Sequence, residues 1–310
     1  MKQSTDKILM IRPVAFEMNK ETAVNNYFQK TLNLKTDEVN TRVQKEFDDF
    51  VKVLQSAGIH VFVYEDIADL KTPDSIFPNN WISFHENGNI VLYPMFAENR
   101  RRERRQDILE GLEKKGFQFH QVYDYTAAED ENVFLEGTGS LILDRENRKA
   151  YCALSPRANE ELLFEFCEDF EYLPIPFKAY QTVDNKRLLI YHTNVMMCVG
   201  TDIAVVCFDS IDDKAEKKLL SKSLKEDGKT IIEISEKQLE AYAGNMLEVQ
   251  NEKGDKFLVM STQAYESLNE TQIQNIEQHL KILHSPINTI ETLGGGSARC
   301  MMAEIFNDKA

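Results

Sequence analysis

The sequence predicts an α/β protein in which five similar units close into one ring. Three observations support this fold class. Amphipathic helices begin roughly every 55 to 60 residues, a strand follows each helix, and pairs of short strands joined by turn residues separate the units. Sequence identity between the units is negligible, so the repeat is one of shape. An open α/β sheet is the alternative, but the many hairpins fit it poorly.

The five helices share an apolar face at helical spacing, and glycines end several of them. Gly58, Gly116 and Gly228 mark the ends of the first, second and fourth helices. The helix starts are predicted near Thr41, Arg100, Arg157, Asp212 and Glu270, and the fifth helix is expected to reach Leu283. The strands that follow the helices are predicted at residues 58–66, 116–124, 171–177, 228–235 and 285–292.

Composition and charge indicate the number of domains, the kind of partner and the location of the protein. The 310 residues show no composition shift that would mark a boundary, so residues 1–310 are expected to form a single domain. The net charge of −15 argues against nucleic acid and anionic membranes as main partners. The chain lacks an apolar run of membrane-spanning length and a secretory signal, which indicates a cytoplasmic protein. A homodimer is compatible with these features.

The five cysteines are odd in number, scattered, and include no CxxC pair. A disulfide framework and a zinc site are therefore not expected, and neither is any other metal or organic cofactor. Cys300 stands out because it follows three glycines in the stretch LGGGSARC, where a backbone or a ligand can approach the chain closely. Taken alone, the stretch slightly favours a flexible loop before a short buried helix, with Cys300 as one more core cysteine.

Polar residues interrupt apolar segments at the loops of the first units. Asp74, Asn79 and Asn80 lie with Phe77 in the stretch TPDSIFPNNW, where an Asx-turn explains any one of them. Five arginines then occupy positions 100–105 at a predicted helix start. Positive charge at that end opposes the helix dipole, so one or two of these arginines could instead bind a carboxylate in bidentate fashion.

Later loops carry four further polar residues of the same kind. Glu136 follows an apolar run and precedes Gly-Thr-Gly, Arg157 follows a strand, and His192 and Asn194 interrupt the run LLIYHTNVMMCVG. A lone histidine in such a place is more often a hydrogen-bonded core residue than a catalyst. Together with Cys300, however, these residues form the set of a Cys-His-Glu nucleophilic site. A cysteine protease would need the same trio, but its local signatures are missing around Cys300.

The motifs EGTG, SPRAN, the His192 segment and GGGSARC occur in an order that resembles the guanidine-modifying, or pentein, superfamily. This superfamily includes arginine deiminase, dimethylarginine dimethylaminohydrolase and the glycine amidinotransferases. The resemblance covers essentially the whole chain and is greatest to the amidinotransferase-like branch linked to citrulline hydrolysis. It implies a fold that agrees with the five units, a five-bladed α/β propeller.

The resemblance also implies roles for individual residues. Cys300 matches the nucleophile, His192 the general acid and base, and Glu136 the carboxylate that orients the histidine. Arg157 and Arg101 match arginines that bind the substrate carboxylate, although the arginine run leaves the second match uncertain by one position. The substrate-binding residues implied in this way are Asp74, Phe77, Asn79, Asn80, Arg101, Arg157 and Asn194.

Two positions depart from the arginine deiminases, which hold a pair of aspartates where this chain has Asn80 and Asn194. Burying a guanidinium without a counter-charge costs several kcal/mol, whereas an asparagine can both donate to and accept from a neutral ureido group. We therefore expect hydrolysis of citrulline to ornithine, carbon dioxide and ammonia. Arginine deimination, dimethylarginine hydrolysis and amidino transfer are the alternatives, and a non-catalytic binding protein is a remote one.

Overall fold

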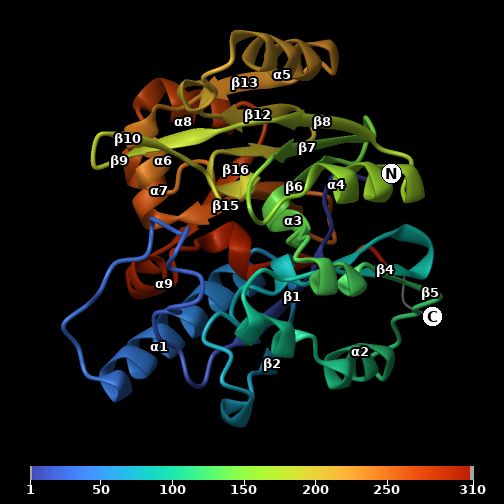
Figure 1. Cartoon of the computed structure of the whole chain (residues 1–310), viewed down its shortest axis with the longest axis vertical. Coiled ribbons are helices and arrows are strands. Elements are labelled where there is room, and N and C mark those ends of the chain that lie inside the picture. Colours follow the sequence, from blue (N-terminus) through green and yellow to red (C-terminus); the bar gives the residue numbers. More distant parts are fainter. Residues whose placement is uncertain (1, 308–310) are drawn as a thin grey trace.

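The computed structural model describes residues 2–307 and has a mixed α/β fold (Figure 1). Five three-stranded sheets share one pattern, in which the middle strand pairs antiparallel with one neighbour and parallel with the other. A sixth sheet is the hairpin β9 (Tyr180–Val183) and β10 (Lys186–Leu189). The first sheet joins the two ends of the chain, because β17 pairs with β1.

The five sheets follow one another along the chain. The first contains β17 (Ala303–Glu304), β1 (Lys7–Arg12) and β2 (His60–Glu65). The second and third contain β3 (Ile82–Phe84), β4 (Asn89–Leu92) and β5 (Gln121–Asp124), and β6 (Leu141–Asp144), β7 (Lys149–Ala153) and β8 (Leu173–Phe177). The fourth and fifth contain β11 (Met197–Val199), β12 (Ile203–Val206) and β13 (Thr230–Glu233), and β14 (Leu247–Gln250), β15 (Lys256–Ser261) and β16 (Lys281–Ser285).

A helix lies in the crossover between the two parallel strands of every three-stranded sheet. These helices are α1 (Thr36–Ser56), α2 (Gln106–Glu113), α4 (Glu160–Asp169), α5 (Lys214–Glu226) and α8 (Glu270–Glu277), and the fifth crossover also contains α7 (Thr262–Ser267). All five predicted helices are thereby confirmed, but the fifth ends at Glu277 and does not reach Leu283. The shorter helices are α3 (Gly137–Ser140), α6 (Glu236–Glu240), α7 (Thr262–Ser267) and α9 (Asn288–Gly294).

The strand predicted at residues 285–292 is wrong. The strand is β16, at Lys281–Ser285, and residues 288–294 form helix α9. Apolar residues continue at helical spacing from α8 into β16, so the sequence alone could not show where the helix ends. Helix α9 begins where the carboxylate of Glu46, from α1, accepts hydrogen bonds from the backbone N–H groups of Thr289 and Ile290. No local sequence signal could show this tertiary cap.

Neighbouring sheets contact each other in chain order. β17 lies beside β3, β6 beside β11, and β11 beside β14. The fifth sheet reaches the first through the backbone of Gln250, whose N–H donates to the carbonyl of Thr5. The described strands do not form one closed sheet, and the closed five-bladed ring of the prediction stays a prediction.

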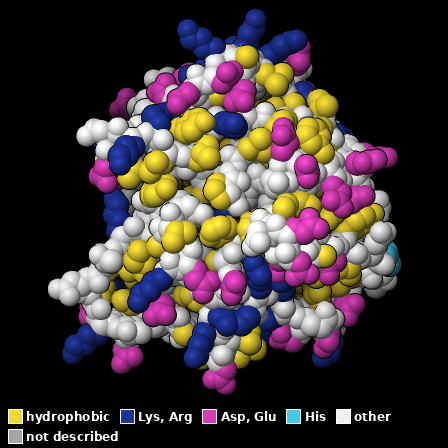
Figure 2. All heavy atoms as spheres, viewed as in Figure 1, with side chains coloured by type: hydrophobic (Ala, Val, Ile, Leu, Met, Phe, Trp, Pro, Cys, Tyr) yellow, Lys and Arg dark blue, Asp and Glu magenta, His cyan; other side chains and the backbone are white. Residues whose placement is uncertain are grey.

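The surface carries both signs of charge. In the view of Figure 2, acidic side chains are spread over the face shown, and basic side chains project at the top, where Figure 1 places the lysine-rich helix α5. The negative net charge is therefore distributed over this face rather than gathered in one patch. Within residues 2–307, no helix has both the length and the apolar character needed to cross a membrane.

The cap of α9 gives a test of the fold. Replacing Glu46 with Ala should lower the free energy of unfolding by about 1 kcal/mol, because two backbone donors at the start of α9 lose their acceptor. Urea denaturation of the two proteins measures the difference. On the same helix, the partly exposed Asp49 pairs with the exposed Lys45 and Lys52, so Asp49→Ala is the control and should change stability much less than Glu46→Ala does. Equal effects would contradict the assigned cap.

Candidate active site

A buried carboxylate and a buried histidine form the centre of the site. Glu136 precedes α3, and His192 precedes a short 3-10 helix at Thr193–Val195. The Nε2 atom of His192 lies 2.7 Å from Oε2 of Glu136, and Arg157 Nη1 lies 3.5 Å from the same oxygen. The backbone N–H of Phe96 donates to the other carboxylate oxygen at 2.9 Å. The carboxylate is thus held from three separate parts of the chain.

These contacts decide the protonation of the pair. Burial alone would raise the pKa of Glu136, but the charge of Arg157 and the hydrogen bond with His192 outweigh it and lower that pKa to about 2. Burial lowers the pKa of His192 to about 4, although Glu136 opposes this shift. At neutral pH the carboxylate is therefore ionised and the imidazole neutral. Its Nε2–H donates to Glu136, which leaves Nδ1 as an acceptor.

Cys300 lies in a 3-10 helix, Ala298–Met301, directly after the glycine-rich stretch. Two side-chain amides donate N–H groups to its sulfur: Nδ2 of Asn194 at 3.3 Å and Nδ2 of Asn245 at 3.2 Å. The cysteine side chain is buried, and it lines the same cavity as His192.

Glycines of two predicted motifs, EGTG and GGGSARC, allow the residues around the cavity to pack closely. A Cβ atom on Gly139 would lie 2.3 Å from Nδ2 of Asn80 and 2.8 Å from Nδ1 of His192. A Cβ atom on Gly296 would lie 2.9 Å from the ring of Phe77. Side chains at these two positions would displace the residues that surround the cavity.

Arg100 orients one of the asparagines. The guanidinium is buried and donates to both carboxylate oxygens of Glu103 at 2.9 Å, while its Nη1 donates to Oδ1 of Asn80 at 2.8 Å. Because a guanidinium can only donate, Oδ1 of Asn80 must face Arg100 and Nδ2 must point the other way. That Nδ2 atom is buried and finds no hydrogen-bond partner among residues 2–307.

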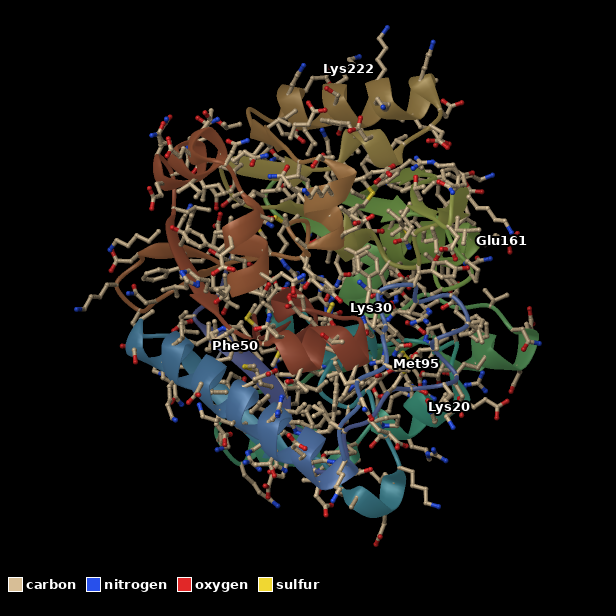
Figure 3. The ribbon with its side chains drawn as sticks, turned by 90° about the vertical axis from the view of Figure 1, so that its left-hand side faces the viewer. Lys20, Lys30, Phe50, Met95, Glu161 and Lys222 are labelled. Atoms are coloured by element: carbon tan, nitrogen blue, oxygen red, sulfur yellow. The ribbon has the colours of Figure 1, made fainter. Side chains whose placement is uncertain are left out.

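A long segment without helix or strand, residues 13–35, covers the site between β1 and α1. Asn19 Nδ2 donates to Asp74 at 2.8 Å, and Oδ1 of Asn25 accepts from Nε of Arg157 at 2.9 Å. The backbone N–H of Lys30 donates to the carbonyl of Thr292, in α9, at 2.6 Å. Figure 3 shows the segment with Lys20 and Lys30 running past α9. Two charged residues of the site, Asp74 and Arg157, therefore find hydrogen-bond partners in this segment.

The cavity at the centre is small. Its volume of about 10 Å³ holds about one water molecule. An amino acid is much larger, so an amino-acid ligand can enter only if part of the wall moves. The residues that line the cavity are Asn26, Asp74, Phe77, Asn80, Arg100, Arg157, Tyr191, His192, Gly294, Gly296 and Cys300.

The structure brings most of the predicted site residues together. Glu136 and Asn194 touch the cavity residues His192 and Cys300. Asn79 is buried next to Asn80, and its carbonyl accepts a hydrogen bond from Thr138. Arg101 lies outside the cavity, half-exposed, with Nε 3.4 Å from Glu129, and Arg100 takes the place in the cavity wall that the sequence analysis gave to Arg101.

Sequence reasoning missed Asn25, Asn26, Tyr191 and Asn245, and it left Arg100 open as an alternative within the arginine run. A positional signal could have found Asn245. Asn80, Gly139 and Asn245 each lie two residues before the first strand of their sheet, and Asn194 and Cys300 each lie three residues before theirs. Side chains at equivalent places of different units thus meet at one point, and the unremarkable stretch AYAGNML supplies one of them.

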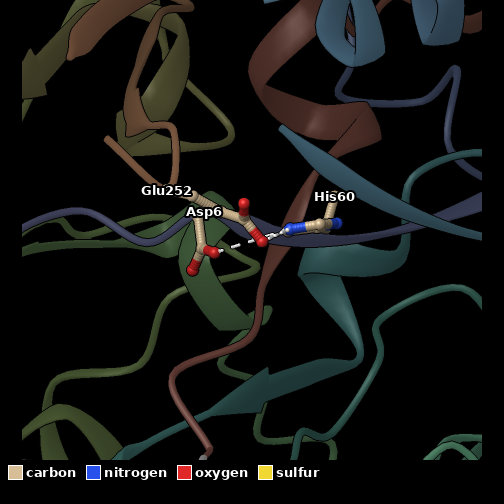
Figure 4. A group of neighbouring side chains, drawn as sticks. All are labelled: Asp6, His60 and Glu252. Atoms are coloured by element: carbon tan, nitrogen blue, oxygen red, sulfur yellow. Dashed lines mark hydrogen bonds and ion pairs between the residues drawn. The ribbon is translucent and has the colours of Figure 1, made fainter. Parts of the chain in front are cut away.

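A second cluster lies on the surface, away from the cavity (Figure 4). The Nε2 atom of His60 is 2.5 Å from a carboxylate oxygen of Glu252 and 4.0 Å from one of Asp6. Within the described chain, these three residues form the one histidine and carboxylate group compact enough to hold a metal ion. All three are at least partly exposed to solvent, and the ion pair alone accounts for their arrangement.

The fold and this constellation place the chain in the guanidine-modifying, or pentein, superfamily. More narrowly, the chain belongs to the family described as eukaryotic N,N dimethylarginine dimethylhydrolase, whose model matches residues 12–307. No curated protein sequence matches the chain significantly.

Several solved structures share the fold. ArgZ, an arginine dihydrolase from the ornithine-ammonia cycle in cyanobacteria, has a TM-score of 0.74 and 16% identity over 98% of this chain, which spans 41% of the ArgZ chain. The N-terminal domain of ArgZ bound to substrate has a TM-score of 0.72 and 15% identity, with 96% of this chain and 97% of that chain covered. A cysteine-to-serine variant of DDAH from Pseudomonas aeruginosa, complexed with citrulline, has a TM-score of 0.67 and 14% identity, with 97% and 100% covered.

The protonation of His192 gives a pH test of the site. Between about pH 7.5 and about pH 5.5, the free energy of unfolding of the parent should fall by roughly 1 kcal/mol more than that of His192→Gln. The reason is that an unfolded histidine takes up a proton below about pH 6.5, whereas the folded His192, with a pKa of about 4, does not. Urea denaturation at several pH values measures this difference. Parallel curves for the two proteins would contradict a neutral, buried His192.

Proposed function

We propose that this protein hydrolyses the ureido group of an amino acid, and that its substrate is citrulline, which it converts to ornithine, carbon dioxide and ammonia. The observation that carries the proposal is the orientation of Asn80. Its Oδ1 is occupied by Arg100, and its Nδ2 is a buried donor that lacks a partner within the described chain. Such a donor costs about 1–3 kcal/mol until an acceptor reaches it.

A ureido oxygen is an acceptor of the required kind. A guanidinium offers only N–H donors, so arginine would bring a donor towards the donor of Asn80. On the acceptor side, Oδ1 of Asn194 and Oδ1 of Asp74 are buried and unpartnered as far as the structure describes the chain. A ureido group, with one acceptor oxygen and several N–H donors, complements this combination of one amide donor and two acceptors.

The proposed reaction uses the three residues matched to the superfamily. The sulfur of Cys300, as the thiolate, attacks the ureido carbon, and the N–H of Asn80 together with backbone amides of residues 294–299 stabilises the oxyanion that forms. One such donor typically lowers the barrier by about 3 kcal/mol. Glu136 keeps Nδ1 of His192 directed at the cavity, where the imidazole holds the proton that the thiol releases.

The intermediate then collapses. His192 gives its proton to the side-chain nitrogen of ornithine, the bond from this nitrogen to the ureido carbon breaks, and a carbamoyl thioester stays on Cys300. Water, deprotonated by His192, attacks the same carbon and expels the thiolate. The released carbamate decomposes to carbon dioxide and ammonia. The reaction consumes one water molecule and changes no oxidation state.

We propose Arg157 and Arg101 as ligands of the substrate carboxylate. Arg157 lines the cavity, and its guanidinium faces the rings of Phe96 and Tyr191 at 5.7 and 4.9 Å. Arg101 stacks on Phe134, which contacts Phe96, so an aromatic layer separates the two arginines. Arg101 would therefore reach only a carboxylate that extends beyond the present cavity, after residues 13–35 have moved aside.

The proposal includes the architecture of the whole chain. The order of contacts between the sheets supports a five-bladed propeller that forms a single catalytic domain, in which the loops before β3, β6, β11, β14 and β17 meet at the central axis. All five cysteines are free thiols, which agrees with the reducing cytoplasm as its place of action.

Arginine dihydrolysis is a second candidate, because ArgZ, a structural neighbour with that activity, covers nearly the whole chain. The family description adds dimethylarginine as a third substrate to test. Pure protein should be incubated with citrulline, arginine and dimethylarginine, and ammonia, dimethylamine, citrulline and ornithine should be counted. Citrulline hydrolysis releases one ammonia per ornithine, and arginine dihydrolysis releases two. Rapid turnover of arginine or dimethylarginine with little turnover of citrulline would contradict the proposal.

The variant Asn80→Asp tests the role of the amide donor. It should lower kcat/KM for citrulline by about a hundredfold, because a carboxylate oxygen replaces the N–H that faces the ureido oxygen. In a Cys300→Ala background, arginine should gain affinity relative to citrulline, since the new carboxylate attracts its guanidinium. Isothermal titration measures both affinities. Asn132→Asp, at an exposed position, is the control for the added charge and should leave both values unchanged.

A further inference from the structure

Asn245 lies behind the sulfur of Cys300 and takes no part in the function described so far. It is fully buried between α6 and β14. Its Nδ2 lies 3.2 Å from Sγ of Cys300 and 2.9 Å from the backbone carbonyl of Asn194. Asn245 is absent from the residues that line the cavity, so it contacts the sulfur without forming part of the cavity wall.

The orientation of the Asn245 amide is determined by its neighbours. The backbone N–H of Arg299 donates to Oδ1 at 3.0 Å, and the carbonyl of Asn194 can only accept. If the oxygen and nitrogen of this amide were exchanged, its N–H would face the N–H of Arg299 and its oxygen would face the carbonyl of Asn194. Gly244 permits this approach, because a Cβ atom there would lie 2.4 Å from the carbonyl oxygen of Val195. Backbone groups of Asn194 and Arg299 thus fix the amide of Asn245 so that its N–H faces Cys300.

A buried thiolate needs such donors, because low dielectric surroundings penalise its charge. In the resting site the neighbouring imidazole is neutral, so the sulfur has no cationic partner until the imidazole accepts the thiol proton. Two amide N–H groups, from Asn194 and Asn245, remain as direct contacts to the sulfur. The titratable groups that share the cavity or lie beside the cysteine are His192, Asp74, Arg100, Arg157, Tyr191 and Tyr242.

We propose that Asn245 is a further catalytic residue, whose side-chain N–H stabilises the thiolate form of Cys300 and directs its sulfur towards the substrate. The inference rests on the proposed function only in taking Cys300 as the nucleophile. Oδ1 of Asn194 is buried without a hydrogen-bond partner within the described residues and is a proposed acceptor for the substrate, so its amide would serve both the sulfur and the substrate. Asn245 serves the sulfur and the backbone alone.

The test measures the thiolate directly, without substrate. In Asn245→Asp, a carboxylate oxygen keeps the bond to Arg299 but replaces the donor that faces the sulfur. The rate constant for alkylation of Cys300 by iodoacetamide near neutral pH should fall about tenfold or more, and the midpoint of its pH profile should rise by about one pH unit. Burial raises the pKa of the other four thiols, so peptide mass spectrometry can follow Cys300 separately.

Steady-state kinetics provide the second readout. Because Asn245 contacts the sulfur and not the cavity, Asn245→Asp should lower kcat for citrulline about a hundredfold with little change in KM. Asn251→Asp is the matched control: this asparagine is also buried, also accepts backbone N–H groups, and lies at the opposite end of β14. It should leave the alkylation profile and kcat unchanged. If Asn245→Asp does not fold, Asn245→Ser, too short to reach the sulfur, replaces it with the same expected result.

The possible outcomes separate the two proposals. An alkylation profile of the folded Asn245 variant that matches the parent would overturn the role of Asn245, whatever the substrate. A shifted profile in a protein that hydrolyses none of the three amino acids would uphold that role and overturn the proposed function. A fall in kcat without any change in alkylation would mean that Asn245 affects the backbone only, and it would also overturn the inference.

Discussion

The carboxylate of Glu136 is the group on which the rest of the site depends. A buried charge is tolerated only when it is paired and hydrogen-bonded, and Glu136 obtains its partners from Arg157, His192 and the backbone of Phe96. Each partner belongs to a different loop, so the charge draws together parts of the chain that are far apart in sequence. It also decides the chemistry of His192, because the carboxylate holds the Nε2 proton and leaves Nδ1 free for the cavity.

The asparagines of the site are also oriented by their hydrogen-bond partners. An asparagine amide has a donor end and an acceptor end, and its neighbours decide which end faces the reacting atoms. Arg100 takes the oxygen of Asn80, and the backbone N–H of Arg299 takes the oxygen of Asn245. In both residues the N–H end is consequently turned inward, towards the cavity in one and towards the sulfur in the other. The two carboxylates that arginine deiminases place in such a site would present acceptors only.

The arrangement of equivalent loops explains how so many polar groups can share one small volume. In the loops before the first strand of each sheet, the residues that meet lie two or three positions ahead of that strand. Glycines in these loops lack the side chains that would keep the loops apart. Residues 13–35 close the volume from outside and supply hydrogen bonds to Asp74 and Arg157.

The sequence by itself determined the five helices and the first four of the strands that follow them, because helical spacing, terminal glycines and hairpin turns are local signals. It also singled out Cys300, His192 and Glu136 as candidates, because an apolar core would not contain such residues. Only the tertiary structure decided that residues 288–294 form a helix capped by Glu46, that Arg100 rather than Arg101 lines the cavity, and that Asn245 reaches the sulfur. In each of these three cases the structure depends on a contact with a distant part of the chain. Such a contact forms only on folding, so no local sequence pattern can indicate it.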